Sequence, residues 1–194
     1  MIYLFFSIIN TFTIANQSQK PSYIIFSTKW IIKMAIPAYL WLKDDGGSLI
    51  KGSVDVTNRE RSIEVISFSH NLYIPTDGNT GKLTGTRVHG ALIFEKEFDS
   101  ASPYLFKAVA TGQSLQSAEF RWYEINNAGQ EVEYYNMLLE GVKVVSVTPM
   151  MHDTKTVINV GHREQVQLRY DKITWHYLDG NIQYSDAWNE RITE

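Results

Sequence analysis

The segment from Gly161 to Trp188 constrains the fold more than any other part of the chain, because its apolar residues recur at every second position. Two runs follow this pattern, the first formed by Val166, Leu168 and Tyr170 and the second by Ile173, Trp175 and Tyr177. Successive side chains of a strand point to opposite faces of a sheet, so this spacing predicts a long β-hairpin arm. The arm carries aromatic and charged residues but no catalytic cluster, which favours a protein that works by assembling.

The two runs differ in parity, and the change falls at Asp171-Lys172. Either a β-bulge there restores the core face, or the strand buries one face in its first half and the other in its second. Both arrangements suit a barrel or a subunit contact. We expect the first run to be buried within the subunit. Residues 178–182 contain Asp, Gly and Asn and predict a tight turn into a returning strand.

The chain has 194 residues, enough for one domain with a real core and not comfortably enough for two. Three of its 18 basic residues and none of its 21 acidic residues lie in positions 1–33, so the remainder carries a net charge of −6. This balance argues mildly against a nucleic-acid partner. The absence of cysteine excludes disulfides and cysteine-based zinc sites.

Residues 1–33 differ in character from the rest of the chain. They open with an apolar run of about signal-peptide length that lacks the Lys or Arg expected before it. Three interpretations are open: a signal peptide, a membrane-associating anchor, or sequence translated upstream of a true start at Met34. We favour the last. We therefore expect residues 1–33 to lie outside the fold and residues 34–194 to form a single domain.

The pattern between Ala38 and Pro149 predicts a mostly β protein with one helix. Together with the arm, we count about eight or nine strands. Ser102 as N-cap, Pro103 at the first helical position and Gly112 at the exit predict the helix. Residues 72–87 hold a proline, three glycines and several small polar residues, so we expect a long exposed loop with little regular structure.

Signatures of enzymes and metal sites are missing. Residues 78–83 lack the full phosphate-loop pattern, and residues 112–116 lack the final glycine of a nucleophile elbow. We expect His70, His89, His152, His162 and His176 to be satisfied or solvent-facing. Glu95, Glu97 and Asp99 alternate along a strand end, where a solvated edge or a subunit salt bridge is favoured over an acid pair or a cation site. Trp41, Trp122, Trp175 and Trp188 are typical of a core rather than of a sugar platform. We predict no catalytic residue, metal site or cofactor.

Four long segments in the same order carry a resemblance to a known family. They are MAIPAYLWLKDDGG from Met34, GTRVHGALIFEKEFDSASPYLFKAVATGQ from Gly85, FRWYEINNAGQEVEYYNMLLEG from Phe120, and HREQVQLRYDKITWHYLDGNIQYSDAW from His162. Through them, residues 34–194 resemble the haemolysin-coregulated protein family, Hcp, the tube protein of bacterial type VI secretion systems. Residues 1–33 depart from the family pattern.

The resemblance implies a two-sheet antiparallel β-barrel with one flanking α-helix, joined into hexameric rings with a central channel. Such rings stack into a tube similar to a phage tail tube, which a contractile sheath propels with a spike protein at its tip. Some family members also hold effector proteins in the ring. The resemblance implies a cytoplasmic protein before firing that is then secreted by the apparatus, with no classical signal peptide and no membrane insertion.

Assembly requires surfaces, and the sequence suggests two. The ring-stacking candidate is the loop of residues 72–87, with its apolar anchors Tyr73, Ile74 and Pro75 and its polar partners Asp77, Lys82 and Arg87. The candidate subunit-contact strand is formed by Ile173, Trp175 and Tyr177. Two rival interpretations are a monomeric secreted β-sandwich that binds a carbohydrate or a protein, and a hydrolase built on the Glu95, Glu97 and Asp99 face.

Overall fold

The computed structural model describes residues 36–156 and 161–190. These residues form twelve strands and one helix: β1 (Ala38–Lys43), β2 (Leu49–Ile50), β3 (Ile63–Val65), β4 (Ser67–Ser69), β5 (Leu72–Tyr73), β6 (Val88–His89), β7 (Leu92–Glu97), α1 (Ser102–Thr111), β8 (Ser114–Ile125), β9 (Glu131–Met150), β10 (Arg163–Arg169), β11 (Lys172–Tyr177) and β12 (Ile182–Ala187). The predicted mostly β, antiparallel fold with one helix is confirmed. The predicted strand number was too low, because β2, β5 and β6 are two-residue pairings too short to show a periodicity.

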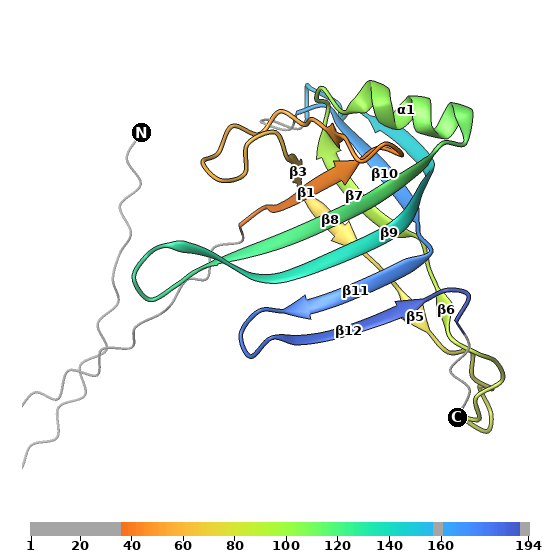
Figure 1. The fold of residues 1–194 in the computed structure, drawn as a ribbon. Helices are drawn as coiled ribbons and strands as arrows, with labels where there is room; N and C mark the ends of the chain where they lie inside the picture. Colours follow the sequence, from red (N-terminus) through yellow and green to blue (C-terminus); the bar gives the residue numbers. More distant parts are fainter. Residues whose placement is uncertain (1–35, 157–160, 191–194) are drawn as a thin grey trace, which may run out of the picture. The chain divides into compact units, whose positions relative to one another are not determined.

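Ten strands hydrogen-bond in one antiparallel sheet, whose main path is β2-β1-β8-β9-β10-β7-β4. β11 pairs with β9 and β12, and β3 pairs with β1. Only Ile66 separates β3 from β4, which pairs with β7, so the pairing returns from β7 to β1 through one segment. Figure 1 shows the result as two crossing layers, with β1, β8, β9, β11 and β12 in front of β7 and β10. The strands therefore wrap around a shared interior.

Alternating side chains fill that interior. Phe120 is fully buried and meets Phe68 and Phe94 edge to face, with ring centroids 5.3 and 5.5 Å apart. Burying one such side chain contributes about 1.5–3 kcal/mol relative to leaving it exposed. The prediction that Val166, Leu168 and Tyr170 are buried is confirmed.

The parity change at Asp171-Lys172 marks a change of neighbours along one continuous path. β10 lies between β9 and β7, whereas β11 lies between β9 and β12. Asp171 packs against Gly141 of β9, whose φ is +63°, and a Cβ at Gly141 would lie only 2.1 Å from Asp171 Oδ2. The strand thus buries one face before Asp171 and the other face after it, which is the second of the two predicted alternatives. The first alternative, a bulge at Asp171-Lys172, is wrong, since the register shift between β10 and β9 falls at Gln167–Leu168.

The helix α1 follows β7 directly. Its N-cap is Ala101 rather than the predicted Ser102, which is the first helical residue. The Ser102 oxygen instead accepts hydrogen bonds from the Asp99 amide at 3.1 Å and from the Lys96 ammonium at 3.0 Å, so its lone pairs are not free to cap the helix. Gly112 ends the helix in the left-handed conformation, as predicted. Leu105 and Ala108 are buried, and they hold the helix on the sheet.

The prediction for residues 1–33 concerns positions outside the described residues. Among the described residues, no helix is both long and apolar enough to cross a membrane.

Candidate assembly surfaces

Residues 72–89 form a projecting loop, called the ribbon below, in which residues 74–87 contain no strand or helix, as the sequence predicted. β5 pairs with β6, and Thr76 and Leu83 form a further bridge. Asp77 closes the tip, since its Oδ1 accepts hydrogen bonds from the Asn79 and Thr80 amides at 2.9 and 2.7 Å. Hydrogen bonds from the amide and hydroxyl of Thr80, and then from the Asn79 amide, lower the pKa of Asp77. These hydrogen bonds close the tip of the loop with a tight turn.

The ribbon exposes apolar side chains to solvent. Tyr73 is 49% exposed, Ile74 43% and Leu83 67%, while Pro75 is half-buried. Lys82 is exposed and has no ion-pair partner among the residues that the structure describes. A group of exposed apolar side chains of this kind is typical of an interaction surface. Leu83 is the most exposed of these apolar side chains and was not among the predicted contact residues.

Arg87 has a different role from the other ribbon residues. Its guanidinium pairs with the Asp186 carboxylate and donates to the carbonyl oxygens of Ala187, at 2.9 Å, and Glu190. This side chain is therefore committed within the chain, where it fastens the root of the ribbon to the end of β12. The prediction that Arg87 contacts another molecule did not include Asp186, which lies 99 positions later in the chain.

A buried hydrogen-bond network extends from that anchor. His89 Nε2 lies 2.9 Å from Asp186 Oδ2, and His89 Nδ1 lies 2.8 Å from the Tyr170 hydroxyl. The same hydroxyl lies 2.7 Å from His70 Nε2. Because the carboxylate only accepts, the neutral form of His89 that fits this geometry is the tautomer that donates from Nε2 to Asp186 and accepts at Nδ1 from Tyr170, whose oxygen in turn accepts from His70. These hydrogen bonds thus connect the base of the ribbon, at β6, to β12 and to the residue after β10.

The electrostatics of this network follow from burial and pairing. Burial raises the pKa of Asp186, but hydrogen bonds from Arg87 and His89 outweigh it and hold that pKa below its usual range. Burial, and then the charge of Asp186, raise the pKa of the Tyr170 hydroxyl. Burial lowers the pKa of His70, and the neighbouring His89 adds to this effect. The network is consequently most stable with Asp186 charged and His70 neutral.

The face of β11 and β12 is the second surface. Trp175 stacks on Tyr184, with ring centroids 6.0 Å apart, and Tyr177 is exposed. Ile182 and Tyr184 on β12 are 65% and 57% exposed, and neither was predicted to be a contact residue. Ile173, in contrast, is fully buried in the core, so its side chain cannot reach a neighbour. Within the described residues β12 pairs only with β11, which leaves its outer edge open.

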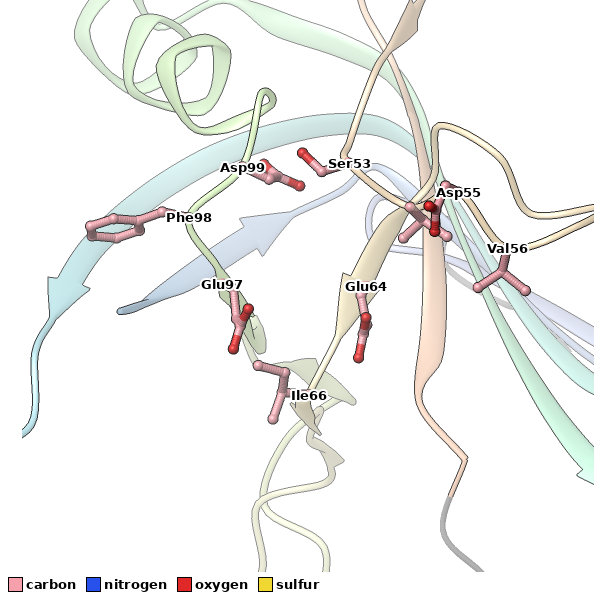
Figure 2. Close-up of a pocket in the computed structure, with 9 residues that line it drawn as sticks. Ser53, Asp55, Val56, Glu64, Ile66, Glu97, Phe98 and Asp99 are labelled. Carbon is pink, nitrogen blue, oxygen red and sulfur yellow. The ribbon is translucent and has the colours of Figure 1, made fainter. Parts of the chain in front are cut away.

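The carboxylates of Glu95, Glu97 and Asp99 do not act together. Asp99 binds the ammonium of Lys96 at 2.7 Å, and Glu164 binds the same ammonium at 2.7 Å. Lys96 and Glu164 are both fully buried, so this cluster fixes the start of α1 against β7 and β10. Glu97 instead lines a hollow with Glu64 and Ile66, which Figure 2 shows.

Several of the remaining aromatic and titratable residues that the structure describes are engaged with other side chains. Trp122 and Trp175 pack on the core, and Arg121 lies 4.5 Å above the Trp41 ring. His176 bonds Asn181 at 2.8 Å. The described part of the chain contains no group of three or more histidines and carboxylates placed to hold a metal ion.

Comparisons with known proteins agree with this fold. The family described as type VI secretion system effector, Hcp, matches residues 39–177. The chain is 33% identical over 170 residues to the major exported protein of Pseudomonas aeruginosa, which covers 82% of this chain and 99% of that protein. The structure of the Hcp1 protein from E. coli EAEC 042 is 68% identical with a TM-score of 0.73, covering 79% of this chain and 99% of that one. The secreted protein Hcp3 from Pseudomonas aeruginosa is 30% identical with a TM-score of 0.65, covering 79% and 99%.

Proposed function

The chain belongs to the Hcp family of type VI secretion proteins, and on that premise we propose that it is a structural subunit of the secretion tube. Copies of it form hexameric rings, and these rings stack into the tube. The role is mechanical, and no step of it requires catalysis.

The exposed apolar surfaces support self-association most directly. The ribbon and the β11–β12 face expose Tyr73, Leu83, Ile182 and Tyr184. They differ in shape and sequence, as heterologous contacts require, because in a ring one surface of a subunit meets a different surface of the next. Stable interfaces bury about 1,200–2,000 Å² in total, so each contact must include several residues around these side chains.

The partners and the route follow from the same proposal. The subunit is assembled in the cytoplasm, enclosed by the sheath and capped by the spike protein. It is then expelled with effector proteins held in its lumen. The name of the Pseudomonas aeruginosa relative, major exported protein, supports export of this chain as well.

The ribbon supplies the experiment. Replacing residues 77–82 with Asn-Gly joins the bridged residues Thr76 and Leu83 by a two-residue turn and removes the projecting tip. We expect rings with an unchanged number of subunits and a loss of stacked tubes in electron micrographs. Tubes that form as well as those of the parent would exclude a stacking role for the ribbon, and a change in the number of subunits per ring would place the ribbon within the ring.

A further inference from the structure

A hollow of about 210 Å³ lies where β7 ends and the chain turns toward α1. Val56, Ile66 and Phe98 give it exposed apolar groups, and Asp55, Glu64 and Glu97 are carboxylates at its border. Figure 2 shows Glu64 and Glu97 on either side of the opening, with Ile66 near them. The hollow therefore combines an apolar lining with negative charge.

These three carboxylates are not neutralised by the protein itself. All are exposed, and none has an ion-pair partner within 4.0 Å among the described residues. Asp99, which also lines the hollow, is already bound to Lys96. Arg163 is the residue opposite Glu97 in the β10–β7 register, yet no ion pair joins the two. The hollow fits a partner that brings a cation together with an apolar group.

The size of the hollow indicates what kind of partner this is. Pockets for small-molecule ligands usually measure about 300–1,000 Å³. A hollow of about 210 Å³ is smaller, and it suits one or two side chains of another protein surface.

The ribbon tip of this same chain carries the matching groups. Lys82 is its unpaired cation and Leu83 its most exposed apolar residue, one position apart. The other charged groups of the ribbon are engaged, since Asp77 accepts the hydrogen bonds of the tip and Arg87 binds Asp186. The tip thus offers the pair of groups that the hollow lacks.

The ribbon and the hollow lie at opposite ends of the same strands. The ribbon precedes β7 and the hollow follows it, and the six residues of β7 span about 20 Å. Figure 1 shows the ribbon and α1, beside which the hollow lies, at opposite ends of the sheet. A chain therefore cannot fill its own hollow, whereas a second copy can.

We infer that the ribbon tip of one copy docks into the hollow of a second copy, with Lys82 among Glu64 and Glu97 and Leu83 against the apolar lining. This inference rests on the proposed function, because it names the receiving surface for the ribbon. Each copy uses its two ends differently, so the contact is heterologous and propagates from copy to copy.

A cysteine cross-link tests the contact in a chain that has no cysteine of its own. The full chain carrying Leu83→Cys and Val56→Cys is oxidised under native conditions and analysed by denaturing electrophoresis. We expect a ladder of covalent oligomers, while each single variant yields no species larger than a dimer. The matched control combines Leu83→Cys with Lys107→Cys, an exposed position on nearby α1 that is outside the hollow, and should yield no ladder.

Charge reversal in the cross-linking chain separates docking from chance collision. Lys82→Glu should slow ladder formation by about two- to fivefold, the range of an exposed ion pair, and adding Glu64→Lys should restore the rate. A ladder beyond six chains places the contact between rings, and a ladder that ends at six places it within one ring. Absence of a ladder, or a ladder equal to that of the control pair, overturns the inference. The native mass of the same samples separates the two proposals, because rings without a ladder leave the tube function intact and monomers without a ladder contradict both.

Discussion

Replacing Tyr170 with phenylalanine removes one buried oxygen atom and leaves the packing of the ring unchanged. The lost hydroxyl lies 2.8 Å from His89 Nδ1 and 2.7 Å from His70 Nε2. His89 is buried, so its Nδ1 lone pair has no water to replace the hydroxyl, whereas half-buried His70 can turn to solvent.

The magnitude follows from the one acceptor that is left without a donor. An unsatisfied buried polar group costs about 1–3 kcal/mol of folding free energy. For a chain of this length, 1 kcal/mol corresponds to about 2–4 °C in Tm, so Tyr170→Phe should lower Tm by about 2–12 °C. The loss should first affect the root of the ribbon, since His89 belongs to β6 and bonds Asp186 of β12.

Thermal unfolding and amide hydrogen exchange measure the two parts of this prediction. Both use the parent and the variant at equal concentration, because assembly makes the apparent stability depend on concentration. Tyr104→Phe is the matched control, because Tyr104 is exposed on α1 and should change Tm by less than the equivalent of about 0.5 kcal/mol. A Tm for Tyr170→Phe equal to that of Tyr104→Phe would show that the network does not stabilise the fold.

Three further predictions concern charge and backbone. The pKa of His70 is lower in the folded state than in the unfolded chain, so the unfolded state binds the proton better. The free energy of unfolding should therefore fall as pH drops below about 6.5. Urea titrations at pH 5–7 should show a weaker dependence of this free energy on pH for His70→Gln than for the parent. An unchanged slope would remove His70 from the network. Lys96→Met leaves Glu164 buried without its cation and should lower the free energy of unfolding by about 3–5 kcal/mol, which chemical unfolding measures. A loss below about 1 kcal/mol would show that the Lys96–Glu164 pair does not fix the start of α1. Gly141→Ala should destabilise by more than 1 kcal/mol, because φ is +63° and the new methyl group meets Asp171, and Asp171→Ala in the same chain should recover part of the loss.

The fold was predictable where the alternation of apolar and polar residues along a strand decides which side chains are buried. Val166, Leu168 and Tyr170 are buried because a strand with one inner face must turn alternate residues inward. The switch after Asp171 was visible as a change of parity. Its cause lies in Gly141 on another strand, and nothing in the local pattern of residues 161–188 identifies that partner.

The candidate surfaces were harder to predict, because exposure depends on residues far apart in the chain. The local sequence around Arg87 indicates a surface cation, but Arg87 forms an ion pair with Asp186, which lies 99 positions later in the chain. Ile173 and Trp175 share one parity, yet the core covers Ile173 fully and Trp175 only partly. The buried Lys96–Glu164 pair was invisible for the same reason, since charged residues at a strand end usually face solvent.

The native mass of the assembled protein tests the central claim most directly. Mass spectrometry under non-denaturing conditions, with the N-terminus of the same sample identified, gives the number of chains per particle without assuming where the chain begins. We expect a particle of six chains, near six times the 22.3 kDa chain mass for the full sequence, together with multiples of it where rings stack. A single-chain mass that persists at high protein concentration would contradict it.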